Sequence, residues 1–461
     1  MRKRLALAAG AVTAIAAAQT LSSPARVLDP AALEKAVRQE MTAENVPGAA
    51  VAVIQGERAI FAKVLGVASV ETGETLGTGM LFRLGSTTKM FTAAALVSLA
   101  IEGKLSLDEP AGKHIPELPP RLAALTAHQL LSNSAGLRDE PALPGPDDEA
   151  ALGRSILAWS DGMFFTAPGK VFSYSNPGYW LAGYLAERVA GKPYAEVLRE
   201  RIFEPVGMTR TTLRPLLAMT YPLAQGHNSP KPGEWKVVRP AVNNAAAWPS
   251  GSIFSSLDDL SRFAVAMLNE GRVEGRQVLP ARLPAMLLER GMPLAGSDAV
   301  YVYGLVRSRE RGVTIASHGG VRAGYGSLIT FAPEQRVAVI VLANRSFAIL
   351  GKAADAALEM LLPFGKPAKE KRKRARAVHP RDFPLYTGLY AQGTMKMEIL
   401  ADRGRLMIRR DAQTMPVTVH EGDEISFTPA GAGAAERAML IRAEGGRVEY
   451  LSLSLHALAR Q

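Results

Sequence analysis

Hydrophobic residues near the start of the chain follow two different spacings. Apolar side chains at about every fourth position predict an amphipathic helix over residues 30–44. Directly afterwards, apolar runs at 49–54 and 59–65 are joined by Gln55-Gly-Glu-Arg58 and predict a β-hairpin. A longer helix is expected over residues 86–102, because Gly103 follows as a stop signal.

The middle of the chain contains few strand-like runs. Residues 105–240 are rich in proline and are interrupted by helical patterns, so they predict a mostly helical subdomain. Strand patterns return in four later runs, at 301–307, 313–317, 326–331 and 337–342. A helix is expected over residues 348–362. This order predicts an α/β (α+β) fold whose sheet draws on both ends of the unit.

A run of basic residues follows this unit. Residues 366–376 hold seven Lys or Arg and one Glu, a composition typical of a solvated linker, which we assign to residues 363–380. A basic contact patch for anionic cell-envelope material is the alternative. Beyond it, alternating runs recur at roughly 8–12-residue spacing, at 386–390, 395–400, 405–410, 415–420, 424–427, 438–442 and 448–453. They predict a small all-β C-terminal domain over residues 381–461, a barrel or a sandwich.

Composition and charge exclude several classes of protein. With 48% hydrophobic and 21% charged residues, the chain can bury a core and is not disordered. The formal net charge is +11, but residues 2–4 and the basic run account for most of it, so nothing indicates a nucleic-acid-binding groove. The chain has no cysteine, which excludes a disulfide scaffold, an iron–sulfur cluster, a thiolate zinc site and a cysteine nucleophile.

Residues 1–18 are typical of a secretory signal peptide. Arg2–Arg4 are basic, residues 5–18 are apolar but too short to span a bilayer, and residues 16–18 give a small-x-small cleavage pattern. An uncleaved membrane anchor is the alternative. No later stretch reaches about 18 uninterrupted apolar residues. We therefore expect an exported protein, periplasmic or secreted, with no stable membrane span once the signal is removed.

Ser86-Thr-Thr-Lys89 is the first motif that carries chemistry. It opens the predicted long helix directly after Gly85. Residues three apart on a helix face the same side, so the Ser86 hydroxyl and the Lys89 amine come within reach of each other. The helix N-terminus leaves the Ser86 backbone N–H available to an oxyanion, and burial lets a lysine take or relay a proton. An N-cap serine beside a surface lysine is the ordinary alternative.

Two further motifs contain groups suited to hydrolysis. In Tyr174-Ser-Asn176, a tyrosine near a lysine can act as general base, and the asparagine amide offers a donor and an acceptor to a substrate. In His318-Gly-Gly320, between two predicted strands, the glycines permit a close approach, and the backbone N–H of Val321 is a candidate second oxyanion donor. Each motif alone also fits an ordinary loop or strand end.

The order of these motifs resembles the serine β-lactamase and penicillin-binding-protein superfamily over about residues 30–362. The resemblance is closest to the branch that contains class C β-lactamases, D-alanyl-D-alanine carboxypeptidases, D-aminopeptidases and family VIII esterases. The most specific block is Phe82-Arg-Leu-Gly-Ser-Thr-Thr-Lys89, and supporting blocks lie at 125–137, 168–176 and 251–260. The resemblance implies a β-lactamase-like domain, assigned to residues 26–362, with an antiparallel sheet flanked by helices and a helical subdomain.

The resemblance also implies roles for the matched residues. Ser86 matches the acylated nucleophile, Lys89 its proton-relay partner and Tyr174 the general base. Asn176 matches a contact to the substrate amide. The motif at 318–320 stands where the family has a Lys-Thr-Gly box, and the C-terminal β domain looks like the accessory barrel of some members.

Two departures from the family pattern concern this box. His318 is mostly neutral at pH 7, unlike a lysine, and Gly319 has no hydroxyl with which to hold a substrate carboxylate. Both changes favour an esterase or a D-amino-acid peptidase or carboxypeptidase over an efficient β-lactamase. His318, Gly320 and Val321 are kept as substrate-binding candidates, and Arg322 is a candidate to compensate for the missing charge.

Other hydrolase classes lack their motifs. There is no Gly-x-Ser-x-Gly elbow, no phosphate-binding glycine loop and no His-x-x-x-His pair. We therefore expect a serine hydrolase that cleaves a β-lactam, a D-amino-acid peptide or a small ester without metal or other cofactor. Its partner would be a small molecule or peptide, including a cell-wall peptide. The alternative is a catalytically weak penicillin-binding or regulatory protein of the same fold that binds cell-wall peptides without turnover.

Overall fold

The computed structural model describes residues 26–141, 143–367 and 373–461. The predicted signal peptide at 1–18 lies outside these residues, as does part of the predicted basic linker. Within the described ranges, no helix is long and apolar enough to cross a membrane.

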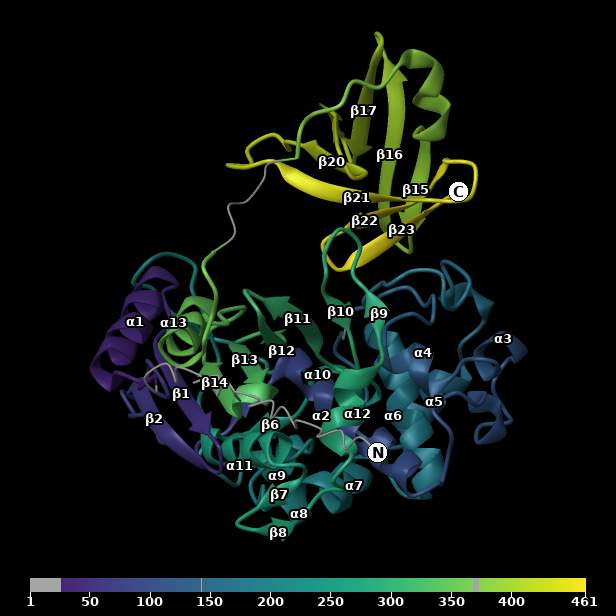
Figure 1. The fold of residues 1–461 in the computed structure, drawn as a ribbon. Helices are drawn as coiled ribbons and strands as arrows, with labels where there is room; N and C mark the ends of the chain where they lie inside the picture. The colour runs from purple at the N-terminus through teal and green to yellow at the C-terminus, as the bar shows by residue number, and fades with distance from the viewer. Residues whose placement is uncertain (1–25, 142, 368–372) are drawn as a thin grey trace, which may run out of the picture.

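One antiparallel sheet of eight strands forms the centre of the larger unit (Figure 1). Its strands are β1 (Gly48–Gln55), β2 (Arg58–Gly66), β9 (Met292–Pro293), β10 (Val300–Tyr301), β11 (Val306–Glu310), β12 (Val313–Arg322), β13 (Tyr325–Ala332) and β14 (Val337–Ala343). They are arranged in the order β2-β1-β14-β13-β12-β11-β10-β9. Because β1 pairs with β14, with Ala49 opposite Ala343, both ends of this unit meet in one sheet, which confirms the prediction.

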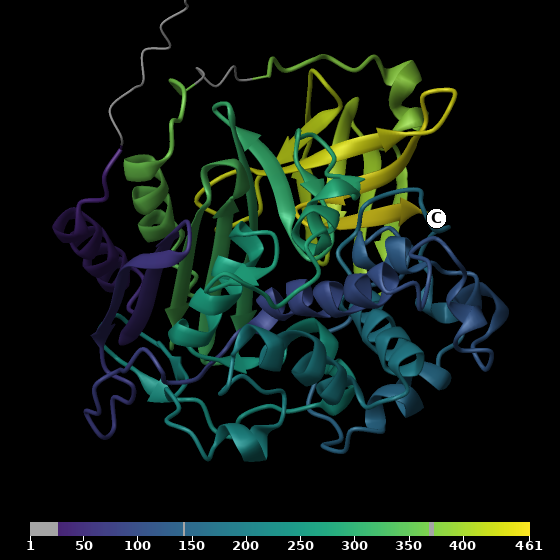
Figure 2. The same ribbon diagram turned by 60° about the horizontal axis from the view of Figure 1, so that its bottom comes forward.

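Helices cover both faces of this sheet (Figure 2). On one face lie α1 (Pro30–Ala43) and α13 (Gly351–Leu361); on the other lie α2 (Thr88–Ile101), α11 (Leu257–Leu268) and α12 (Leu283–Glu289). Successive strand residues point to opposite faces, so the apolar run of β1 serves two cores. Ala49, Val51 and Val53 pack with α1 and α13, whereas Ala50, Ala52 and Ile54 pack in the core around α2.

The segment between β2 and β9 is mostly helical, as its pattern predicts. Its remaining helices are α3 (Pro120–Ala123), α4 (Ala127–Leu131), α5 (Ala151–Leu157), α6 (Asn176–Ala190), α7 (Tyr194–Leu198), α8 (Glu204–Val206), α9 (Pro215–Ala218) and α10 (Trp248–Gly251). Its strands are short and paired: β3 (Phe82–Arg83) with β6 (Phe254–Ser255), β4 (His227–Asn228) with β5 (Lys236–Val237), and β7 (Arg272–Val273) with β8 (Arg276–Gln277). The long helices α2 and α6 pack against each other, and the motifs Ser86-Thr-Thr-Lys89 and Tyr174-Ser-Asn176 lead into their N-terminal ends.

The C-terminal domain is all-β, as predicted, and its sheet is nearly closed. Its strands are β15 (Gly388–Gln392), β16 (Met395–Asp402), β17 (Arg405–Arg410), β18 (Gln413–Pro416), β19 (Thr418–His420), β20 (Glu424–Phe427), β21 (Glu436–Arg442), β22 (Val448–Leu453) and β23 (His456–Arg460). In the sheet order, β18 and β19 stand at opposite ends, yet only Val417 separates them in sequence. The two ends of the sheet therefore meet, which is the geometry of a barrel.

Several predicted boundaries differ from the observed ones. The run 301–307 is not one strand, because the chain turns at Gly304, where φ is +76° and an added Cβ would lie 2.7 Å from the backbone of Met90. The run 415–420 is likewise divided into β18 and β19, and the helix predicted over 348–362 begins only at Gly351. The His318-Gly-Gly320 motif lies inside β12 rather than between two strands, since pairing with β13 continues to Arg322.

Candidate active site

Ser86 lies on a short 3-10 turn, Gly85–Thr87, that leads into α2. Gly85 has φ +58°, and an added Cβ there would lie 2.6 Å from the backbone nitrogen of Val321 on β12. Only glycine meets both demands without strain. The turn therefore holds the half-buried Ser86 hydroxyl against the end of the central sheet.

Lys89 follows one helical turn later and is completely buried. Its Nζ donates to the Asn176 Oδ1 at 2.7 Å and to the Ser250 carbonyl oxygen at 2.8 Å, and it lies 3.5 Å from the Ser86 Oγ. Burial lowers the pKa of Lys89 to about 7, because a charged ammonium loses its hydration there. A substantial neutral fraction of this amine, able to accept a proton, is therefore present at neutral pH.

Tyr174 also lies next to Ser86. The Lys89 Nζ is 4.7 Å from the centroid of its ring. Burial raises the pKa of Tyr174 well above its ordinary value, the neighbouring Tyr301 raises it further, and a hydrogen bond with Ser86 opposes this rise. The phenol is thus protonated at neutral pH and can donate a hydrogen bond or pass on a proton.

Asn176, at the start of α6, is hydrogen-bonded to the protein through its side-chain amide and its backbone N–H. Besides accepting from Lys89, it donates its backbone N–H to the Asp139 Oδ1 at 2.7 Å and its Nδ2 to the Glu140 carbonyl oxygen at 3.4 Å. The amide therefore fixes Lys89 in place, and a substrate contact would compete with these bonds.

His318 faces the same group of side chains from β12. Its Nδ1 lies 2.6 Å from the Gly319 carbonyl oxygen and its Nε2 lies 3.2 Å from the Tyr301 hydroxyl. Since a carbonyl can only accept, the proton is assigned to Nδ1, and Nε2 accepts from the tyrosine. Burial, with the nearby Lys89, lowers the pKa of His318 to about 3, so the third motif offers no positive charge at neutral pH.

Gly320 and Val321 bring β12 against the serine turn. A Cβ on Gly320 would overlap the Leu84 carbonyl oxygen, so this approach requires glycine. β11 pairs with β12 only as far as Ser317. The stretch from 318 to 322 therefore has one open backbone edge beside Ser86. The Val321 backbone lies next to the turn that carries this serine.

The C-terminal domain also reaches this site. Leu455, in the turn between β22 and β23, accepts a hydrogen bond through its carbonyl oxygen from the Tyr174 backbone N–H at 2.8 Å. The neighbouring His456 places its Nε2 3.1 Å from the Asp139 Oδ2. Figure 1 shows β22 and β23 on the side of the domain that faces the larger unit.

These groups surround one mainly apolar cavity of about 700 Å³. Among its lining residues are Ser86, Asp139, Tyr174, Asn176, Val242, Tyr301, His318, Val321, Arg322, Phe347, Ile349, Leu455 and His456. The structure thus brings the predicted site residues together at this cavity. Lys89 and Gly320 lie just behind its wall, and the others line it. Sequence reasoning missed Asp139, Tyr301, Leu455 and His456, which stand outside any motif and meet only through the fold.

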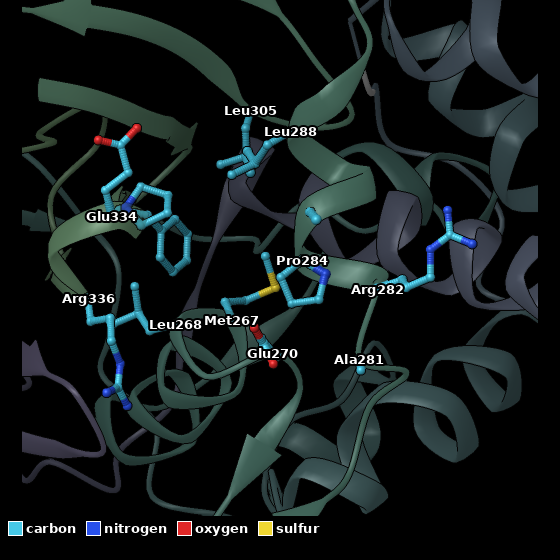
Figure 3. A pocket seen from close by; sticks show the side chains of 13 residues that line it. Met267, Leu268, Glu270, Ala281, Arg282, Pro284, Leu288, Leu305, Glu334 and Arg336 are labelled. Carbon is cyan, nitrogen blue, oxygen red and sulfur yellow. The ribbon is translucent and has the colours of Figure 1, made fainter. Parts of the chain in front are cut away.

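A second cavity, of about 630 Å³, lies beside α11 and α12 (Figure 3). Figure 3 shows Leu288 and Leu305 on one side and Met267 and Leu268 on another. Its lining contains no Ser, Thr, Tyr, Lys or His, so it lacks a hydroxyl or amine nucleophile. Among the described residues, no group of three or more His, Asp or Glu is placed to hold a metal ion.

Comparison with known proteins matches this arrangement to one family. A β-lactamase family model matches residues 33–362. Penicillin-binding protein 4 of Amycolatopsis lactamdurans is 27% identical over 322 residues, 66% of this chain and 82% of that protein. A D-aminopeptidase of Brucella anthropi is 27% identical over 432 residues, 87% of this chain and 79% of that protein. The crystal structure of SurE shares the fold, with a TM-score of 0.77, 24% identity, and coverage of 94% of this chain and 99% of that one. Since the family model spans well over half of the sequence, the chain belongs to the β-lactamase family.

Proposed function

We propose that this chain is a serine hydrolase that cleaves an ester or amide through an acyl-enzyme on Ser86. The observation that carries this proposal is the convergence of Ser86, Lys89 and Tyr174 on one cavity, with the lysine buried and its pKa lowered to about 7. A nucleophile beside a neutral amine is the arrangement that nucleophilic catalysis needs.

In the first step, the Ser86 Oγ attacks the substrate carbonyl carbon and its proton passes to the neutral Lys89 amine. Negative charge develops on the carbonyl oxygen, which the backbone N–H groups of Ser86 and Val321 stabilise. The bond to the leaving group then breaks, and the leaving group takes the proton from Lys89 by way of the Tyr174 hydroxyl. This assigns the general-base role to Lys89 and a proton-relay role to Tyr174, whose raised pKa disfavours a phenolate.

In the second step, water attacks the acyl-enzyme carbonyl. Its proton passes to Lys89, and the Ser86 Oγ leaves and is reprotonated. Asn176 holds the lysine amine in place throughout, through its Oδ1. The proton that Lys89 takes up in each step is returned within that step, so the cycle is balanced with water as the co-substrate.

The neutral His318 supports esters and D-amino-acid peptides over β-lactams as substrates. A family member that holds a terminal carboxylate with this box needs a positive charge there, and the buried imidazole has none at neutral pH. The similarity to a D-aminopeptidase supports the same substrate class. We also propose export to the periplasm or the medium by residues 1–18, and division of the mature chain at 362 and 381.

The test uses a neutral fluorophosphonate probe followed by intact-mass and peptide mass spectrometry. We expect one adduct, on Ser86, that Ser86→Ala abolishes and that the control Ser308→Ala, on β11, retains. Turnover of nitrocefin, short-chain 4-nitrophenyl esters and D-alanyl peptides by the same samples then identifies the substrate class. If no probe labels Ser86 and no substrate is turned over, the chain is a binding protein of this fold, and the proposal is wrong.

A further inference from the structure

Two buried arginines meet beside the catalytic cavity. The Arg322 Nη2 donates to the Val242 carbonyl oxygen at 2.8 Å, and the Arg83 Nη1 donates to the same oxygen at 2.6 Å. Arg322 also donates through Nη1 to the Gly251 carbonyl oxygen at 2.7 Å and to the Ser252 Oγ at 3.1 Å. In the part of the chain that the structure describes, neither guanidinium forms an ion pair with a carboxylate.

This pair carries positive charge that the protein leaves uncompensated. Burial lowers the pKa of Arg83 to about 10, and burial together with the charge of Arg83 lowers the pKa of Arg322 to about 9. Both groups remain charged at neutral pH. The Nε of each arginine and the Nη2 of Arg83 are buried without a partner in the described chain. Buried charge without a counter-ion is unfavourable, so the site is suited to an anion supplied from outside.

Arg322 can meet such an anion because it lines the catalytic cavity, as Val242 does. On β12 it stands four residues beyond His318, a distance of about 13 Å along a strand. Tyr174, Tyr301 and His456 gather at the His318 end of the cavity. Ser86 faces the stretch between these two ends, next to Val321.

The two ends of the cavity serve different parts of the substrate. The leaving group must lie near Tyr174, which relays its proton in the proposed mechanism. The acyl group therefore extends the other way, along the open edge of β12 toward Arg322. Val321, Phe347 and Ile349 are exposed apolar residues of the cavity wall, and Ile349 lies beside Gly319. Phe347 has φ +65°, a strained conformation for a bulky residue.

We propose that Arg322, with Arg83 behind it, binds a carboxylate on the acyl part of the substrate. The substrate class is an ester or amide of a short dicarboxylic acid, such as a glutaryl or γ-glutamyl derivative. Its methylene groups lie along the open edge of β12 beside Val321, and its carboxylate accepts from the Arg322 guanidinium. This inference rests on the proposed hydrolase function and places the anion on the opposite side of Ser86 from His318.

The test compares two esters of equal acyl length. Mono(4-nitrophenyl) glutarate carries the carboxylate, whereas 4-nitrophenyl pentanoate has a methyl group in its place, and uncatalysed hydrolysis is subtracted from both rates. We expect the wild-type kcat/KM to be at least about tenfold higher for the glutarate, the effect of a charged hydrogen bond. Arg322→Gln should lower the glutarate value by about 10–100-fold and the pentanoate value by less than about threefold. The matched control Arg309→Gln, on the exposed end of β11, should leave both unchanged.

A measurement on the unaltered protein guards against misfolding of the Arg322 variant. Free glutarate should slow fluorophosphonate labelling of Ser86, and free pentanoate should do so less. Because Arg322 is buried, added salt should reduce this difference only slightly. Equal kcat/KM for the two esters, equal loss for both in Arg322→Gln, or equal protection by the two acids would overturn the inference while leaving the hydrolase intact. Absence of labelling and of turnover would refute the hydrolase instead, and calorimetry with glutarate would then test the carboxylate site by itself.

Discussion

At Gly320, strand β12 lies directly against the turn Gly85–Thr87 that carries Ser86. A side chain there would overlap the Leu84 carbonyl oxygen and approach the Thr87 backbone nitrogen to 2.9 Å. Its neighbour Gly319 points to the opposite face, where an added Cβ would meet nothing closer than the Ile349 Cδ1 at 3.7 Å, an ordinary van der Waals contact. Position 319 therefore has room for a Cβ, whereas position 320 does not.

We predict that Gly320→Ala lowers kcat/KM at least about 100-fold, because β12 must move away from Ser86 and take the Val321 N–H with it. The free energy of unfolding should fall by about 1–3 kcal/mol from overpacking. Gly319→Ala is the matched control and should change activity less than about threefold. Ester hydrolysis and urea denaturation measure both. Equal activity of the two variants would show that the approach of β12 is not required.

The buried Lys89 couples function to stability. The unfolded chain binds a proton on this amine below about pH 10.5, whereas the folded chain binds it only below about pH 7. Between these values the unfolded state holds more protons, so stability rises with pH; below pH 7 the cost of burying the charge is fully present.

We therefore predict that Lys89→Met abolishes turnover yet raises the melting temperature. The gain should be several degrees at pH 7 and smaller at pH 10, because pH 10 lies close to the pKa of the lysine in the unfolded chain and little free energy is then lost by keeping the buried amine neutral. Melting curves of the wild type and the variant across this pH range provide the measurement. A gain that grows with pH would contradict the assigned direction of the pKa.

At the scale of single elements, the β22–β23 turn is the part of the C-terminal domain that contacts the candidate site. A chain of contacts leads from His456 to the Asp139 carboxylate, from Asp139 to the Asn176 backbone, and from the Asn176 amide to Lys89. Each distance is 2.7–3.1 Å. The turn therefore helps to position the Lys89 amine beside Ser86.

We predict that His456→Ala lowers kcat about tenfold, which is the effect of losing one or two hydrogen bonds that hold the lysine partner. His420→Ala is the matched control, since His420 belongs to the same domain but contacts Ser426 and does not line the catalytic cavity. The kcat of this control should stay within about twofold of wild type, because a substitution away from the site changes the free energy by only about ±0.5 kcal/mol. Parallel losses in both variants would point to general damage to the domain.

Short-range patterns predicted these elements well where neighbouring residues decide the outcome. The hairpin of β1 and β2, the helix that carries Lys89, and most C-terminal strands follow from local periodicity. The division of 301–307 escaped prediction because Gly304 turns to avoid α2, which is a contact with a distant segment. Strand β23 was missed because its Ala and Leu residues show no clear alternation.

The residues of the candidate site also differ in how far local patterns predict their positions. Ser86 and Lys89 share one helix turn, so their proximity could be inferred from spacing. That Tyr174 and His318 join them was expected only from a family resemblance. Asp139 and His456 lie in no motif, and their meeting depends on how the barrel docks, which no local pattern encodes.

At the scale of the whole molecule, the two units share an apolar interface. Val171 and Phe165 of the larger unit pack with Tyr450, Ala457 and Ala459 of the barrel. The Tyr450 hydroxyl and the Thr166 hydroxyl are 2.7 Å apart, and the Gln392 Nε2 donates to the Ser173 Oγ at 2.7 Å. Because Tyr174 follows directly, docking of the barrel and geometry of the site are linked.

We predict that Tyr450→Ala lowers kcat/KM at least about tenfold although this residue does not line the cavity. Removal of its ring opens the interface and releases the Tyr174 backbone from Leu455. Leu389→Ala is the matched control: an exposed apolar residue of the same domain, outside this interface. Steady-state kinetics on the two variants test this prediction. Unchanged kinetics in Tyr450→Ala would show that activity does not depend on this interface.

The pairing of β1 with β14 has a consequence for how the polypeptide reaches its native state. Ala49 must find Ala343 across the whole helical segment, and such distant pairings make folding slow. Until then the hairpin of β1 and β2 presents an unpaired apolar edge, a template for association with other chains. Refolding from denaturant should therefore take seconds or longer, and its yield should fall as protein concentration rises.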